Sequence, residues 1–193
     1  MAASAIPVNV GGTMTLRLPL ALASLLLVFG AVARAASPDA GNDPTVPGAT
    51  TLLQDARGAT VGRVTLTDTP HGLLVRGSLI GVPRGAHAIH FHETGTCEPP
   101  FKTAGGHFNP GQKAHGMLDV AGPHAGDMPN LVVPKDGSLE FEFFVQGLTL
   151  AAGPSSLFDT NGTSIVLHAR ADDYRTQPAG DSGDRIACGV VTR

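Results

Sequence analysis

The sequence lacks any concentration of basic residues, and this argues against nucleic acid as a partner. Its 193 residues include 13 Lys or Arg against 16 Asp or Glu, which gives a formal net charge of −3. A protein that binds nucleic acid needs a basic surface to neutralise phosphates. We therefore expect no nucleic-acid partner.

The sequence has only one long apolar run, and this run lies near the N-terminus. Arg17 precedes an apolar run over residues 18–32, and Ala33-Arg34-Ala35 follows it. This order is typical of a secretory signal peptide with a small-residue cleavage site, which we place at residues 1–35. The run is too short for a convincing membrane span, and a single N-terminal anchor helix is the alternative.

Cleavage after residue 35 would leave a more acidic protein that has no membrane partner. The removed segment holds two of the 13 basic residues, Arg17 and Arg34, and none of the 16 acidic ones, so the remainder carries 11 − 16 = −5. No cysteine lies near the cut to carry a lipid anchor. We expect an exported protein, in the periplasm or secreted.

Cysteine is limited to Cys97 and Cys188. An even pair in an exported chain favours a disulfide, which in the chain-entropy model would stabilise the fold by roughly 4–5 kcal/mol for a loop of this length. Two buried free thiols are the alternative.

A helical hydrophobic period is absent as well, and the fold class follows from the pattern that replaces it. Short apolar or alternating segments are separated by Gly, Pro and Asp turns, which predicts an all-β fold, a Greek-key β-barrel or sandwich with long loops. Residues 36–48 have no periodicity and are predicted to be a flexible leader before one domain at 49–193. The predicted strands cover residues 50–55, 60–68, 72–80, 85–93, 130–133, 138–145, 163–170 and 186–191.

Histidine, in contrast, is concentrated in one stretch. Five of the eight histidines fall between residues 90 and 127, and Asp127 closes the stretch, much of which is rich in Gly and Pro. Three imidazoles and one carboxylate, from His107, His115, His124 and Asp127, suit tetrahedral zinc. His90 and His92 would share one face of a strand, although this spacing alone is weak evidence, and His168 on a later strand could join them.

Together these residues resemble the copper/zinc superoxide dismutases, in the bacterial exported branch. The resemblance runs from about residue 50 to the C-terminus. It rests on His90-Phe-His92-Glu93, Gly105-Gly-His107-Phe-Asn-Pro110, Lys113-Ala-His115-Gly116, His124-Ala-Gly-Asp127, Leu167-His168-Ala-Arg-Ala-Asp172-Asp173 and Arg185-Ile-Ala-Cys188.

The resemblance implies an antioxidant oxidoreductase that converts two superoxide anions and two protons to oxygen and hydrogen peroxide by copper redox cycling. It implies one copper and one zinc per chain, a structural role for zinc, and a homodimer as one candidate assembly. The implied copper ligands are His90, His92, His107 and His168, and the implied zinc ligands are His107, His115, His124 and Asp127. His107 would bridge the metals.

Three further assignments follow from the same resemblance. Asp172 would join His90 to His115, and Cys97 would pair with Cys188. Arg185 would hold superoxide beside the copper, so that Arg185 and His107 would be the catalytic residues.

Three other interpretations compete with this one. A copper-buffering protein could use the same ligands without turnover, although storage gives Arg185 no purpose. A serine hydrolase is suggested by Gly180-Asp181-Ser182-Gly183, where turn chemistry explains the serine equally well. A purely structural β-domain would leave the histidines unexplained.

The chain departs from the family beside Arg185. Asp184 stands where the family usually has a small neutral residue, Asp181 is close by, and Ala179 replaces a frequent threonine. Arg175 is the only other basic residue between Asp173 and Arg185. Each change should weaken the attraction of an anion to the entrance.

Overall fold

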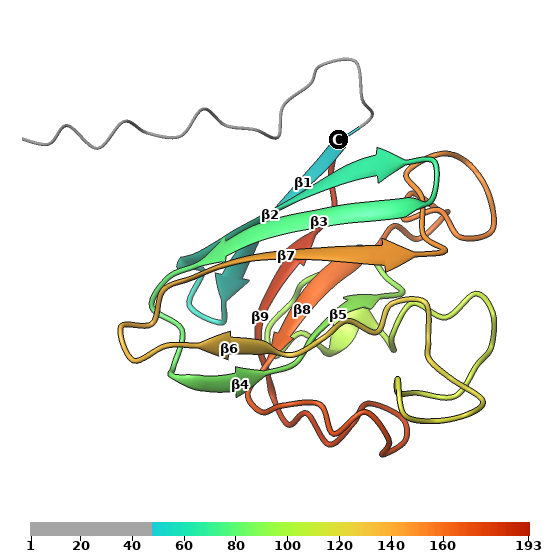
Figure 1. The fold of residues 1–193 in the computed structure, drawn as a ribbon. Helices are drawn as coiled ribbons and strands as arrows, with labels where there is room; N and C mark the ends of the chain where they lie inside the picture. Colours follow the sequence, from blue (N-terminus) through green and yellow to red (C-terminus); the bar gives the residue numbers. More distant parts are fainter. Residues whose placement is uncertain (1–47) are drawn as a thin grey trace, which may run out of the picture. The chain divides into compact units, whose positions relative to one another are not determined.

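The computed structural model describes residues 48–193, and almost all of its regular structure is β-strand (Figure 1). In this part of the chain no helix is long and apolar enough to cross a membrane. The strands are β1 (Gly48–Asp55), β2 (Thr60–Thr69), β3 (Gly72–Leu79), β4 (Gly85–His87), β5 (Ile89–His92), β6 (Leu131–Val133), β7 (Leu139–Gln146), β8 (Ser164–His168) and β9 (Arg185–Val190). A 3-10 turn, η1 (Lys102–Ala104), was not predicted.

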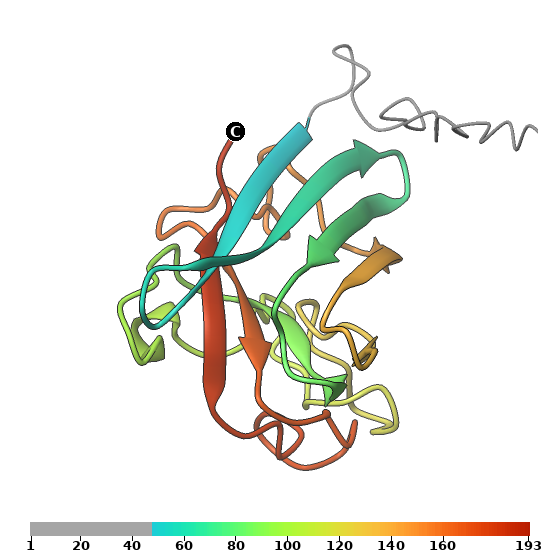
Figure 2. The same ribbon diagram turned by 90° about the vertical axis from the view of Figure 1, so that its left-hand side faces the viewer.

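Seven strands form one antiparallel sheet in the order β5-β8-β9-β1-β2-β3-β7, and β4 pairs with β6 separately. Figures 1 and 2 show this sheet curling around its concave side. The connection from β7 to β8 crosses nearly the whole sheet, because β7 forms one edge and β8 lies next to the other. The predicted all-β class is confirmed. The predicted signal peptide and leader lie outside the described residues, apart from Gly48, which begins β1.

One predicted strand, residues 85–93, is wrong as a single element. The chain breaks at Ala88 into β4, which pairs with β6, and β5, which pairs with β8. Ala88 is fully buried and exchanges backbone hydrogen bonds with Arg170 and His168 instead. The break lets one continuous stretch of chain serve two different sheets.

Strand alternation separates the core from the histidines. Ile89 and Phe91 of β5 pair with Leu167 and Ile165 of β8, and all four side chains lie in the main hydrophobic core. Because neighbouring side chains on a strand point to opposite faces, His90 and His92 lie on the other face of the same sheet. The histidines are nevertheless fully buried, because loops cover that face.

Two long loops provide this cover, residues 93–130 between β5 and β6 and residues 169–184 between β8 and β9. The second loop lies at the bottom of Figures 1 and 2, and the first extends from mid-height toward the bottom. Isolated bridges tie the first loop to β5, between His90 and Asp127 and between His92 and His107.

A disulfide fixes the start of the first loop. Cys97 and Cys188 are joined with their Cα atoms 5.6 Å apart, which confirms the predicted pair. Around the bond, Phe101, Ala104 and Val166 form a second, smaller core. The disulfide therefore anchors the beginning of the loop to β9.

Candidate metal centre

Four imidazoles meet on the loop-covered face of the sheet. His90 and His92 come from β5, His168 from the end of β8, and His107 from the first loop. One ring nitrogen of each lies within 4.8 Å of the other three. We call these four residues the all-histidine cluster.

The free nitrogens of this cluster fit a metal ion. Nδ1 of His90 and Nε2 of His92, His107 and His168 are buried and have no hydrogen-bond partner in the described residues. Burying an unpaired polar atom costs free energy, and such groups in native proteins need an explanation. Coordination of one ion by all four nitrogens would provide it, and four nitrogen donors are a set that copper accepts.

The all-histidine cluster is also in the right protonation state. Burial lowers the pKa of His107 to about 4 and that of His168 to about 3, and it lowers the pKa of His90 and His92 as well. Neutral imidazoles keep a lone pair at neutral pH, which a metal ligand requires.

A second cluster, which we call the aspartate cluster, comprises His107, His115, His124 and Asp127. Asp127 Oδ1 lies 2.8 Å from His107 Nδ1 and 3.3 Å from His124 Nδ1, and the two nitrogens are 3.4 Å apart. His115 Nδ1 lies 3.1 Å from Asp127 Oδ2. Ligands about 2.0–2.1 Å from a tetrahedral ion are separated by roughly 3.3 Å, so this donor set fits zinc.

His107 belongs to both clusters through different atoms. Its Nδ1 faces Asp127, whereas its Nε2 is one of the unpartnered nitrogens of the all-histidine cluster. An imidazole can bind two metals at once only after both nitrogens lose their protons. The geometry therefore offers two ions a shared ligand.

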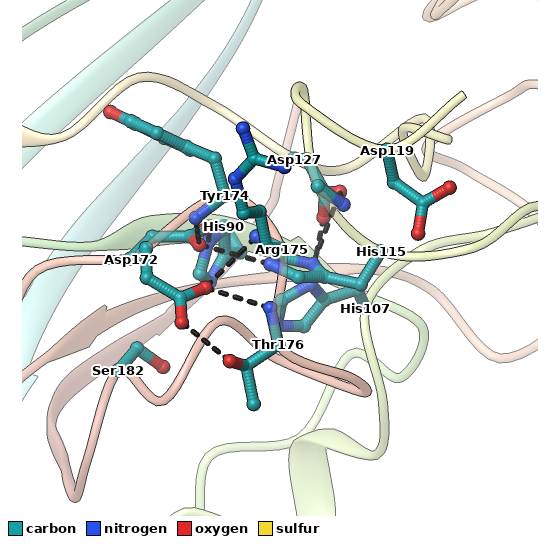
Figure 3. Close-up of polar contacts among 12 residues, drawn as sticks. His90, His107, His115, Asp119, Asp127, Asp172, Tyr174, Arg175, Thr176 and Ser182 are labelled. Carbon is teal, nitrogen blue, oxygen red and sulfur yellow. Dashed lines mark hydrogen bonds and ion pairs between the residues drawn. The ribbon is translucent and has the colours of Figure 1, made fainter. Parts of the chain in front are cut away.

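Asp172 links the two clusters from the second loop. Its carboxylate lies 2.9 Å from His90 Nε2 and 3.0 Å from His115 Nε2, where it can accept both N–H groups (Figure 3). Burial alone would lower the pKa of His115, but the carboxylates of Asp127 and Asp172 outweigh it and raise that pKa to about 9. The same negative charge that stabilises a proton here would stabilise a metal cation.

Two amide side chains, neither of them predicted from the sequence, fix the backbone of His115 and of Asp172. Gln177 accepts a hydrogen bond from the backbone N–H of His115 at 2.8 Å and donates to its carbonyl at 2.9 Å. Asn130 makes the equivalent pair with the backbone of Asp172, at 2.8 Å each. Each amide accepts one backbone hydrogen bond and donates another, as a neighbouring strand would. No local sequence pattern indicates that these two residues have this role.

Arg185 lies at the start of β9 and is half-buried. Its guanidinium donates to the carbonyls of Phe101 and Gly105, each at 2.7 Å. Burial, the neighbouring His107 and the positive charge of Arg185 all lower the pKa of His92. The charge of Arg185 therefore acts on the all-histidine cluster. The first loop, close to its disulfide, thus orients the arginine through two carbonyl oxygens.

The acidic neighbours of Arg185 differ from one another. Asp181 forms an ion pair with Arg170 at 2.6 Å, so a second cation compensates its charge. Asp184 is exposed and has no ion-pair partner within the described residues. Of the two predicted acidic perturbations, Asp184 is the uncompensated one.

The serine-hydrolase interpretation finds no support in this geometry. Ser182 is only 2% exposed, and its hydroxyl lies against His168, a member of the all-histidine cluster. A nucleophile must reach its substrate, and a hydroxyl buried behind a histidine ring does not. The turn explanation of Ser182 is incomplete as well, because the side chain faces inward.

Comparisons with known proteins agree with this picture. The family model described as copper/zinc superoxide dismutase matches residues 60–191. The chain is 44% identical over 142 residues to superoxide dismutase [Cu-Zn] 2 of Aquifex aeolicus, a match that covers 72% of this chain and 83% of that protein. It is 42% identical over 147 residues to superoxide dismutase [Cu-Zn] of Caulobacter vibrioides, covering 74% and 84%. Among solved structures, the Cu/Zn superoxide dismutase from Brucella abortus matches with a TM-score of 0.62 and 27% identity, covering 75% of this chain and 99% of that one.

Proposed function

The chain belongs to the copper/zinc superoxide dismutase family, and we propose from this premise that its all-histidine cluster holds copper and its aspartate cluster holds zinc. The protein is an oxidoreductase that converts superoxide to oxygen and hydrogen peroxide, with copper and zinc as cofactors. The observation that carries the proposed site is the set of four buried imidazole nitrogens that lie within 4.8 Å of one another and have no hydrogen-bond partner among residues 48–193.

The two clusters divide the chemistry. When bound, copper supplies the one-electron redox couple, which zinc cannot supply because it has no redox chemistry. The aspartate cluster would hold the His107 ring through Nδ1 and leave Nε2 directed at the copper site. His107 Nε2 is then the atom at which the chain can hold a proton close to the substrate.

Arg185 is the residue that would bind the anion. Superoxide is negatively charged, whereas the protein has a net negative charge, so approach requires a local positive field. The guanidinium is fixed by the carbonyls of Phe101 and Gly105, and a fixed charge loses less entropy when it binds its partner. This role distinguishes turnover from simple copper storage.

Metal analysis combined with a superoxide assay on the same purified sample tests the proposal. We expect about one copper and one zinc per chain after loading, together with superoxide consumption. Protein loaded with zinc alone is the control and should be inactive. Full copper occupancy without superoxide consumption would favour the copper-buffering interpretation.

We also propose that the protein is exported to the periplasm, with residues 1–35 removed, residues 36–48 as a leader and residues 49–193 as the enzyme domain. The Cys97–Cys188 disulfide supports an oxidising compartment. The mass of protein isolated from the source cells should correspond to a chain that begins at Ala36. The expected homodimer stays a prediction, which light scattering on the same sample checks.

Removal of the charge of Asp184 should increase the rate at low ionic strength. Asp184 is exposed, uncompensated and adjacent to the anion-binding Arg185. The rate should rise in Asp184→Asn and in Asp184→Gly, and the gain should shrink as salt rises, because screening acts over about 8–10 Å at ordinary ionic strength. Arg185→Ala should instead lower the rate and flatten its salt dependence.

The control for this experiment is Asp136→Asn, in the exposed β6–β7 turn. It changes the net charge by the same amount, and asparagine can keep the hydrogen bond to the Ser138 N–H. Rates of Asp184→Asn that match the wild type over a salt series would show that Asp184 has no part in attracting the substrate.

A further inference from the structure

Ser182 has a contact that neither the metal sites nor the substrate site explains. Its Oγ lies 3.0 Å from Nδ1 of His168, and the serine is buried. Its backbone is held on both sides, because its N–H donates to Ala179 and its carbonyl accepts from Arg170. The second loop therefore presents the hydroxyl to the ring in a fixed position.

The need for this contact follows from the tautomers of imidazole. A neutral imidazole carries one N–H, so Nε2 of His168 has a free lone pair only when the proton sits on Nδ1. Nε2 is the atom that faces the all-histidine cluster, where it is buried and has no partner in the part of the chain that the structure describes. The opposite N–H then needs an acceptor, and Ser182 Oγ is the better placed one, since the carbonyl of Gly183 is 3.5 Å away.

Two other rings of the cluster, those of His90 and His92, show the same pattern with different acceptors. His90 directs its second nitrogen at the Asp172 carboxylate, and His92 directs its own at the Gly105 carbonyl, 3.1 Å away. Acceptors of this kind fix the orientation of a ligating imidazole and make it a stronger donor. For His168, the corresponding acceptor is the hydroxyl of Ser182.

We propose that Ser182 is a positioning residue for copper, which accepts the Nδ1–H of His168 and so holds Nε2 ready to bind the metal. The proposal rests on the copper assignment of His168. A serine oxygen that accepts this hydrogen bond makes the imidazole more electron-rich and favours Cu(II) over Cu(I). Ser182 therefore contributes to the reduction potential of the copper site as well as to its affinity.

The test compares Ser182→Ala with the wild type, both loaded with zinc. We expect Cu(II) affinity, measured by competition with a chelator, to fall about tenfold, at the lower end of the range for such partners. If Cu(I) affinity stays unchanged, the copper reduction potential rises by about 59 mV, because a tenfold change in an equilibrium constant corresponds to that shift for a one-electron couple. Zinc affinity should match the wild type, because Ser182 does not contact the aspartate cluster.

Two further variants separate this role from a packing effect. Ser156→Ala removes another buried serine hydroxyl, one that accepts from the Phe158 N–H, and should leave copper affinity and potential as in the wild type. Ser182→Thr keeps the acceptor and should restore both values toward the wild type. Equal losses in the alanine and threonine variants would overturn the proposal.

His168→Ala distinguishes a failure of this inference from a failure of the copper assignment. If His168→Ala binds copper as tightly as the wild type, the assignment of His168 is wrong. If His168→Ala loses copper while Ser182→Ala keeps wild-type affinity and potential, the assignment stands and Ser182 has no role in it.

Discussion

Replacement of His107 by alanine is expected to abolish superoxide turnover and to weaken both metal sites together. One side chain supplies Nδ1 to the aspartate cluster and Nε2 to the all-histidine cluster, so its loss removes a donor from each. The loss of affinity at each site should exceed the roughly 10–100-fold that removal of a ligand's hydrogen-bond partner costs. Chelator competition for each metal and a superoxide assay measure the effects.

Two single-cluster variants serve as controls for His107→Ala. His92→Ala removes a donor from the all-histidine cluster alone and should weaken copper far more than zinc. His124→Ala removes one from the aspartate cluster alone and should do the reverse. If His107→Ala behaved like His124→Ala, with zinc lost and copper turnover at the wild-type rate, His107 would not be a shared ligand.

Asp172→Asn should weaken metal retention, zinc in particular, by roughly 10–100-fold while leaving the fold intact. The carboxylate accepts from His90 Nε2 through one oxygen and from His115 Nε2 through the other. Asparagine has one oxygen and one NH₂ group, so it can accept from only one ring and places a donor against the other N–H. One imidazole must then turn or change tautomer, which misaligns its metal-binding nitrogen.

The neighbouring Asp173→Asn is the matched control. Asp173 is exposed, and its carboxylate binds the Thr176 hydroxyl and nearby backbone N–H groups rather than a histidine. Both variants remove one negative charge from the same loop, and only Asp172→Asn should release zinc to a chelator. Equal zinc retention in Asp172→Asn and the wild type would remove Asp172 from the metal site.

The sequence alone was sufficient for the fold class, the family and the candidate ligands. Alternation along β5 places His90 and His92 on one face because neighbouring strand residues point opposite ways, and this needs no tertiary information. The Gly- and Pro-rich stretch that carries His107, His115 and His124 was evident from composition. The two cysteines required only counting and an expected compartment.

Tertiary structure decided where β4 and β5 divide and which side chains support the ligands. Ala88 looks like any small apolar residue in a strand, and only the competing pairings with β6 and β8 make it a break. Gln177 reaches the backbone of His115 across 62 positions, and Asn130 reaches that of Asp172 across 42. Ser182 is only 14 positions from His168, yet its Gly- and Asp-rich surroundings in the sequence indicate no more than a turn. Amide and hydroxyl groups can hydrogen-bond to almost any backbone or ring, so their partners are fixed only when the loops close over the sheet.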